Sequence, residues 1–318
     1  MFVAFSPLRS DSTRHQSEFD PLSLVLRCGL RSRSSPCEST RLYSRGEAAT
    51  ADSAYADLVL SGPWIYPVAF FAALLIATIT TPAGVSGAVL LLPFQVSILG
   101  TPSPAVTPTN LLYNIVAAPG ALYRCWRQGQ TGGTLTPRLL FGSIPGVIVG
   151  SVVRVELLPG PRAFDAIIAV VLIPLGTYLV VRQTAANRSG LTGLLPLVFI
   201  AAVVGCVGGL YGIGGGSILA PILIGAGWSP KDVAPATLAS TFVTSIAGVI
   251  TFLILASLHG GSVAPDWGVG LALGAGGIIG GYCGARLQPR LPEDTIRRLL
   301  GGIVTAIGLR YAWLVSER

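Results

Sequence analysis

The chain has 318 residues, of which 51% are hydrophobic and 11% are charged, and its formal net charge is +7. Soluble domains carry roughly a quarter charged residues, so this chain has too few charges to cover a surface in water, and lipid is its expected solvent. The positive charge does not indicate a nucleic-acid partner, because the arginines form no single cluster and most of those beyond residue 57 flank apolar segments. The five cysteines contain no CxxC pair and the two histidines are far apart, so we expect no metal site, no disulfide framework and no cofactor.

Residues 1–57 are polar, rich in Ser and Arg, and lack the apolar h-region of a cleavable signal peptide. We interpret them as a disordered cytoplasmic tail or as an extension that is not part of the working protein. From Trp64 onward, apolar segments follow at approximately 64–99, 105–123, 139–153, 163–181, 191–227, 233–258, 267–285 and 296–315. Segments that face lipid must be helical, because unpaired backbone groups in hydrocarbon cost several kcal/mol each. We therefore predict an all-α integral membrane protein with about eight transmembrane helices.

Two of these segments are too long for one crossing, and glycines interrupt both. The interruptions read TPAGVSGAVLLLP (Thr81–Pro93) and GLYGIGGGSILAP (Gly209–Pro221), and a constant shift of 128 residues superposes them. The same shift places Thr109 on Thr237, and a shift of 130 places Gly146 on Gly276 further along. We therefore predict two homologous membrane repeats, residues 64–187 and 188–318, each with a Gly-broken or re-entrant helix. Four spans per half would make the repeats parallel and five would invert them, and the sequence leaves this open.

Interrupted hydrophobic segments at corresponding points of two halves indicate a transporter binding site. A break frees backbone N–H groups at the start of the following half-helix, where the helix dipole adds a partial positive charge, so two such ends could hold an anion. We predict that the substrate-binding residues are loop residues of the breaks and polar residues of the helices that follow: Gly84, Ser86, Gly87, Asn110, Asn114, Gly212, Gly214, Gly215, Gly216, Thr237 and Thr241. We expect Pro93 and Pro221 to be structural residues of the two helix breaks. The alternative that stays open is that the glycines serve close helix packing and the polar residues serve helix–helix hydrogen bonds.

At these residues the chain resembles a known family. GIGGGSILAPIL (Gly212–Leu223), followed by APATLASTFVTSIAG (Ala234–Gly248), resembles the sulfite exporter TauE/SafE permeases, and GVSGAVLLLPFQVSILG (Gly84–Gly100) fits the first repeat of that family. The resemblance covers about residues 64–315. It implies a multi-pass protein of the cell membrane that moves sulfite, sulfonates or related organic anions. Ser86 and Ala88 stand where the second half has Gly214 and Gly216, so the first loop has less backbone freedom.

We expect outward transport, because a monovalent anion that leaves a negative interior gains about 2.3 kcal/mol per 100 mV. The acidic residues lie at the ends of apolar segments, and no proton relay is predicted from them. The expected partners are a small anionic substrate and the lipid bilayer, with no nucleic acid, and assembly with a second copy of the chain stays open. Eight crossings would place the loop Arg124–Arg138 on the cytoplasmic side together with the basic N-terminal segment, and would leave Arg286 outside.

Two other classes of protein compete with the permease. The sequence GVSG (Gly84–Gly87) looks like the nucleophile motif of rhomboid intramembrane serine proteases, with Ser86 as nucleophile and His259 as base. The repeat explains this motif more simply, because the second half has GIGG at the same place without a serine, and we expect no enzyme. The third class is a membrane assembly subunit without transport activity, which the sequence leaves open.

Overall fold

The structure is a computed structural model that describes residues 62–81, 86–127, 129, 132–158, 160–181, 193–226, 228, 230–259, 263–287 and 293–317. The predicted tail (residues 1–57) and Gly84 lie outside these residues. The described residues contain ten helices and no strand, which confirms the all-α prediction. The helices are α3 (Ile65–Thr80), α4 (Ala88–Ser97), α5 (Ser103–Arg127), α6 (Leu135–Glu156), α7 (Pro161–Val181), α8 (Leu194–Tyr211), α9 (Gly216–Gly225), α10 (Pro230–His259), α11 (Trp267–Leu287) and α12 (Glu293–Glu317). Eight of them are long, while α4 and α9, which follow the two predicted breaks, have 10 residues each.

The outward-facing surface of the helices is apolar, as a lipid environment requires. Within the described residues, α6, α7, α8, α10 and α11 are each long and apolar enough to cross a membrane. Large hydrophobic side chains point outward, and Phe141, Leu195 and Phe199 are 77%, 83% and 69% exposed. Contiguous apolar exposure of this kind would be unfavourable in water and is expected against lipid. The chain is therefore a multi-pass membrane protein.

Small residues bring the helix backbones into direct contact across the two halves. A side-chain carbon on Gly146 of α6 would overlap the carbonyl oxygen of Ala202 in α8, and one on Gly280 of α11 would overlap that of Leu74 in α3. The pairs α5–α11 and α6–α10 also pack together, as do α5–α10 and α7–α12. The contacts are thus reciprocal: the fourth helix of each predicted repeat packs on the first and third helices of the other. The repeat boundaries themselves stay a prediction.

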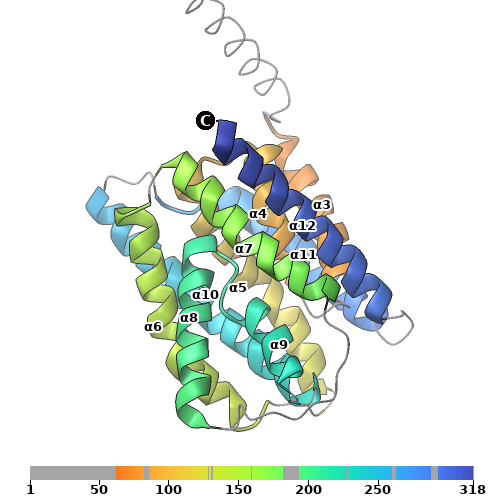
Figure 1. Ribbon diagram of the computed structural model, residues 1–318. Coiled ribbons are helices and arrows are strands. Elements are labelled where there is room, and N and C mark those ends of the chain that lie inside the picture. The colour runs from red at the N-terminus through yellow and green to blue at the C-terminus, as the bar shows by residue number, and fades with distance from the viewer. Residues whose placement is uncertain are drawn as a thin grey trace, which may run out of the picture. The chain divides into compact units, whose positions relative to one another are not determined.

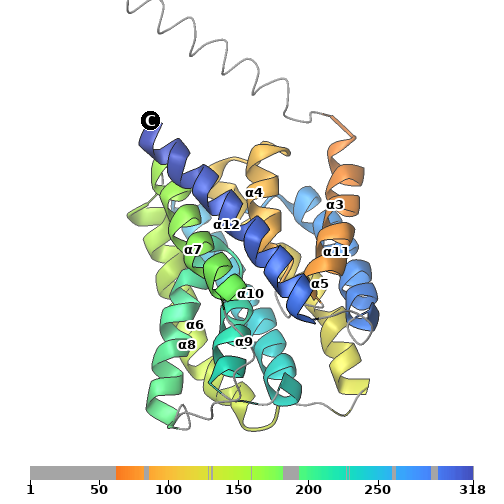
Figure 2. The same ribbon diagram turned by 45° about the vertical axis from the view of Figure 1, so that its right-hand side comes forward.

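The two short helices run in opposite directions. The hydroxyl groups of Ser97, in the last turn of α4, and Tyr311, near the end of α12, lie 3.1 Å apart. The hydroxyl of Tyr178, near the end of α7, donates to the carbonyl oxygen of Pro221 in α9 at 2.9 Å. Because α7 and α12 are antiparallel, with Gly308 packed on Ile173, α4 and α9 point toward opposite ends of the bundle (Figures 1 and 2).

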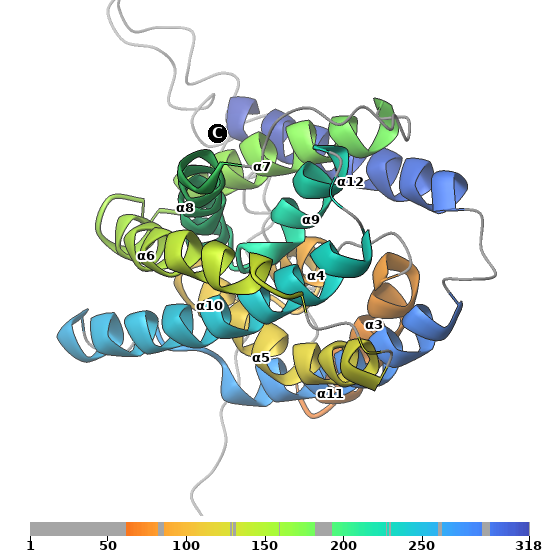
Figure 3. The same ribbon diagram turned by 90° about the horizontal axis from the view of Figure 1, so that it is seen from below.

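Each half therefore contains a re-entrant pair, α3–α4 or α8–α9, followed by three longer helices. Helices α7 and α12, which correspond in the two predicted repeats, run antiparallel, as inverted repeats require, and the number of membrane crossings per half stays a prediction. The end-on view in Figure 3 shows α4 and α9 between the longer helices.

The ends of α5 and α11, which carry arginines in their last turns, lie on one side, opposite to the start of α3, whereas Arg154 at the end of α6 lies on the other side. Helices α3, α5 and α11 run in the same direction, since Gly280 packs on Leu74 and Gly120 on Ile278. The end of α5 with Arg124, and the end of α11 with Arg286, therefore share a side, and α3 begins on the other. Eight crossings would place Arg124 and Arg286 on opposite sides, whereas α5 and α11 run in the same direction, so that their ends share a side.

Candidate functional site

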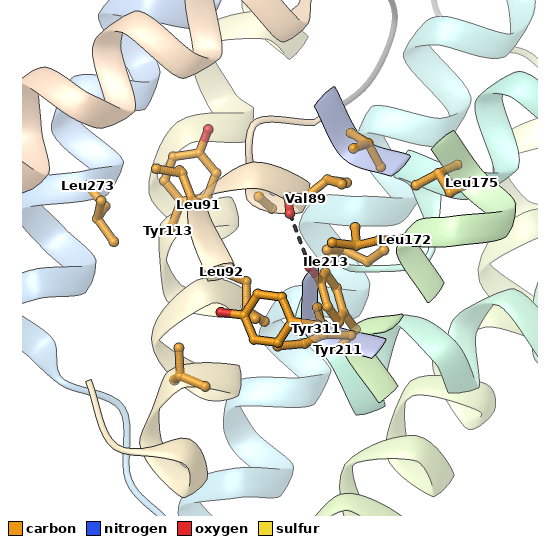
Figure 4. Close-up of a cluster of buried hydrophobic side chains, with 14 of the residues drawn as sticks. Val89, Leu91, Leu92, Tyr113, Leu172, Leu175, Tyr211, Ile213, Leu273 and Tyr311 are labelled. Atoms are coloured by element: carbon orange, nitrogen blue, oxygen red, sulfur yellow. Dashed lines mark hydrogen bonds between the residues drawn. The ribbon is translucent and has the colours of Figure 1, made fainter. Parts of the chain in front are cut away.

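The two breaks meet inside the protein and are hydrogen-bonded to each other. The hydroxyl of Tyr211, the last residue of α8, donates to the carbonyl oxygen of Val89 in α4 at 3.1 Å (Figure 4). The side-chain amide of Asn114 in α5 donates to the carbonyl oxygen of Gly212 at 3.4 Å and accepts from the hydroxyl of Ser86 at 3.2 Å. One residue of α5 thus bridges the first break to the second.

The amino end of α4 is closed by residues of its own half. The hydroxyl and carbonyl oxygens of Ser86 accept from the backbone amides of Ala88 and Val89, each at 3.2 Å. The side-chain amide of Asn110 donates to the carbonyl oxygen of Ala88 at 2.9 Å, and Gln95 donates to Asn110 at 3.1 Å. The predicted residues Ser86, Asn110 and Asn114 therefore lie together, and each already has a hydrogen-bond partner in the protein.

The second break needs glycine for backbone conformation and for space. Gly212 and Gly214 have φ angles of 80° and 65°, in the left-handed region that favours glycine. A Cβ atom on Gly212 would lie 2.6 Å from the carbonyl oxygen of Thr107 in α5, and one on Gly216 would overlap the carbonyl oxygen of Thr237 in α10. The loop is thus pressed between α5 and α10.

The amino end of α9 differs from that of α4 because its first amides are uncapped. No hydrogen bond joins the backbone N–H groups of Gly216, Ser217 or Ile218 to any residue that the structure describes, and Gly215 at the N-cap provides no side-chain cap. The first amide with an acceptor is that of Leu219, which donates to Gly215 at 3.3 Å. Unpaired amides at a helix start, together with the helix dipole, favour an anion.

The predicted site residues fall into two groups at these helix ends. Ser86, Gly87, Asn110 and Asn114 lie at the amino end of α4, and Gly212, Gly214, Gly215, Gly216, Thr237 and Thr241 lie at that of α9. Thr237 donates its hydroxyl to the carbonyl oxygen of Val233 at 2.9 Å, whereas Thr241 packs against Gly214 and Gly216.

The predicted break prolines stand apart from the breaks. Pro93 and Pro221 lie inside α4 and α9, more than one turn beyond the glycines at which the chain breaks. The predicted site residue Gly84 lies outside the described residues.

Sequence reasoning missed the buried residue Arg154, which is 1% exposed near the end of α6. Its guanidinium donates to the carbonyl oxygen of Leu158 and to the carbonyl and hydroxyl oxygens of Ser103, the latter two at 2.9 and 2.6 Å. It also lies 4.4 Å from the ring centre of Phe164. Arg154 follows directly on the apolar segment 139–153, so its position resembled a segment end. Its contacts join the start of α5 to the turn between α6 and α7.

Among the described residues, the hydroxyl of Ser86 has a hydrogen-bond acceptor other than the base that a serine protease would need. A general base must lie within hydrogen-bond reach of its nucleophile, and Ser86 instead donates to Asn114. Among the described residues, no three His, Cys, Asp or Glu side chains gather closely enough to hold a metal ion.

Comparison with known proteins places these features in context. The family model of the sulfite exporter TauE/SafE proteins matches residues 69–311. "Probable membrane transporter protein y4hK" of Sinorhizobium fredii is 25% identical over 257 residues, which cover 77% of this chain and 96% of that protein. "Probable membrane transporter protein YjnA" of Bacillus subtilis is 28% identical over 71% of this chain and 92% of its own length. "Probable membrane transporter protein YunE" of Bacillus subtilis is 34% identical, over 35% of this chain and 38% of its own length. No solved structure matches the chain.

Proposed function

Because the chain belongs to the sulfite exporter TauE/SafE family and is a membrane transporter, we propose that its substrate is a small sulfur-containing or organic anion such as sulfite. The proposed direction is outward across the cell membrane. The observation that supports this proposal is the meeting of two glycine-broken helix ends, joined through Asn114 and Tyr211, with uncapped amides at the start of α9.

Neutral donors are suited to a substrate that must leave again. In a water-poor interior, amides that point at an anion replace part of its hydration shell, and the low local dielectric strengthens each hydrogen bond. A buried arginine at the same place would bind more tightly and would have to be desolvated itself. The buried Arg154 lies away from the breaks, at the turn between α6 and α7.

The orientation follows from the distribution of arginines. Helices α5 and α11 end with Arg124, Arg127 and Arg286 on one side, and positive charge at helix ends marks the cytoplasmic side. In this proposed orientation the α8–α9 pair enters from the cytoplasm and the α3–α4 pair from outside, which departs from the cytoplasmic N-terminal segment that the sequence predicts. With a negative interior, exit of a monovalent anion gains about 2.3 kcal/mol per 100 mV, so the proposed export needs no bound proton.

Flux in liposomes tests this proposal. The purified protein is reconstituted, loaded with sulfite, a sulfonate or sulfate in turn, and a membrane potential is imposed with potassium and valinomycin. Sulfite or sulfonate efflux should exceed that of empty liposomes and of the variant Gly215→Val, whose side chain would press on Ser143, 3.3 Å from the Cβ position. Equal traces for protein-containing and empty liposomes with all three anions would refute the proposal and favour an assembly subunit.

A further inference from the structure

Two buried hydroxyl groups beside the second break make no hydrogen bond to any residue that the structure describes. Ser143 of α6 and Ser245 of α10 are both 0% exposed, and neither hydroxyl has a partner among the described residues. Thr109 and Thr244 each donate to the carbonyl oxygen one turn earlier, at 2.7 and 2.6 Å, whereas Thr80, Thr107, Ser151 and Ser240 also lack a partner among the described residues. Burial of an unpartnered hydroxyl is unfavourable, and what distinguishes Ser143 and Ser245 is their place beside the second break.

Both hydroxyls lie against the loop that leads into α9. The Oγ atom of Ser143 is 3.3 Å from the position that a Cβ atom would take on Gly215, and the Oγ atom of Ser245 is 3.0 Å from that position on Gly214. They approach the loop from two different helices. The amides of Gly216 and Ser217, which have no acceptor among the described residues, follow directly in the chain. Two hydroxyl donors and the uncapped helix start therefore gather at one place.

Among the described residues, the first amides of α4 are already capped at the first break, although the buried hydroxyl of Thr80 at the end of α3 has no partner there. At α4, Ser86 caps the amides of Ala88 and Val89, and its own hydroxyl donates to Asn114. The residue that corresponds to Ser86 in the second half is Gly214, which has no side chain to act as a cap. The two ends are thus chemically unequal although the sequence places them in equivalent positions.

We propose that the transported anion binds at the amino end of α9 and not at that of α4, and that Ser143 and Ser245 donate their hydroxyl protons to it. This inference rests on the proposed function and specifies its site. A sulfite-like anion has several acceptor oxygens, which can accept from backbone amides and from both hydroxyls at once. Ser143 and Ser245 then determine affinity and selectivity, and no charged side chain is required.

Sulfite binding to the purified full-length protein in lipid nanodiscs, measured by isothermal titration calorimetry, tests the inference. The variants Ser143→Ala and Ser245→Ala should each raise the Kd about tenfold or more, because each removes a hydrogen bond to a charged ligand. Matched controls exist on the same two helices, Ser151→Ala on α6 and Ser240→Ala on α10. Both controls remove a hydroxyl that is 0% exposed and unpartnered among the described residues.

Neither control side chain is among the nearest neighbours of the Cβ positions of Gly214, Gly215 and Gly216. Ser151 is two turns, about 12 Å, beyond Ser143, and Ser240 is five residues before Ser245 on another face of α10. We expect both control variants to stay within about twofold of the wild-type Kd, since neither lost hydroxyl belongs to the proposed site. If either alanine variant is not monodisperse, Ser143→Cys or Ser245→Cys gives the same comparison, because a thiol of similar size is only a weak donor.

The outcomes separate this inference from the proposed function. Absence of sulfite and sulfonate binding and flux in the wild-type protein would overturn the proposed function. Wild-type binding that Ser143→Ala and Ser245→Ala leave unchanged would overturn the inference alone. Losses as large in Ser151→Ala and Ser240→Ala would also overturn it, because they would show a general packing effect.

Discussion

Gly212 offers the sharpest test of how the two halves meet, because three constraints act on it. Its φ angle is 80°, its carbonyl oxygen accepts from Asn114, and a Cβ atom there would lie 2.6 Å from the carbonyl oxygen of Thr107. For Gly212→Ala, the left-handed conformation costs about 1–2 kcal/mol. The forced separation of the loop from α5 adds about 1–3 kcal/mol, as overpacking generally does.

A matched control separates these two effects. Gly129 has a φ angle of 71° and nothing within 4 Å of the position that its Cβ atom would take. Gly129→Ala should therefore lower stability only through the cost of the left-handed backbone conformation. The difference between the two variants is then the packing effect of about 1–3 kcal/mol, or roughly 2–12 °C in the unfolding midpoint for a chain of this size.

The assay is thermal unfolding in detergent, followed by the loss of monodisperse protein in size-exclusion chromatography, with anion flux in liposomes measured alongside. We expect Gly212→Ala to unfold below Gly129→Ala and to lose flux, because the shift also moves the acceptor of Asn114. Equal unfolding midpoints for the two variants would refute the close contact between Gly212 and α5 and, with it, the described meeting of the breaks.

Three further predictions concern the contacts around this site. Ser86→Ala and Asn114→Ala, alone and combined, should show a coupling of about 0.6 kcal/mol in a double-mutant cycle of thermal stability, and strict additivity would contradict the 3.2 Å hydrogen bond as a stabilising link. Arg154→Met should lower the free energy of unfolding by about 3 kcal/mol or more in the same assay, since it leaves the carbonyl oxygens of Ser103 and Leu158 without their donor. The control Arg162→Ala, on the exposed start of α7, should change it by about 0.5 kcal/mol at most. Gly150→Ala should reduce the yield of monodisperse protein, because its Cβ atom would overlap the carbonyl oxygen of Cys206, and Gly302→Ala, with nothing within 4 Å, should be tolerated; equal yields would argue against the close packing of α6 on α8.

The helices and breaks could be predicted from the sequence because lipid imposes simple rules. An apolar segment in a bilayer must pair its own backbone groups, so segments such as 163–181 read directly as helices, and this one is α7 (Pro161–Val181). Both breaks were visible because glycine clusters interrupt segments that are too long for one crossing. Which helices pack on each other could not be predicted from the sequence. The packing depends on whether the segment 64–99 crosses the membrane or turns back within it, and its apolar composition is compatible with either path.

The binding chemistry of the site was harder to predict because it depends on which polar side chains already form hydrogen bonds within the protein. Asn110 and Asn114 carry the strongest polar signal in the first half, and the structure shows both donating to main-chain carbonyl oxygens. Ser143 has a weak signal in FGSIPG (Phe141–Gly146), where a lone serine in an apolar helix is normally expected to bond to its own backbone. Only the packing of α6 against the second break gives this hydroxyl a distinct position.

One difference between the two predicted halves accounts for the unequal capping of the two breaks. With Ser86 before α4, the first break caps its own amides, and with Gly214 before α9, the second leaves its amides uncapped. The capped break is nevertheless held to the open one by Tyr211 and Asn114, each of which reaches from its own half to a carbonyl oxygen of the other. Any displacement of one inverted half against the other must stretch both hydrogen bonds and move α9 relative to Ser143. In the proposed mechanism, anion binding at the α9 end is therefore energetically linked to the relative position of the two predicted halves, as alternating access requires of a transport site.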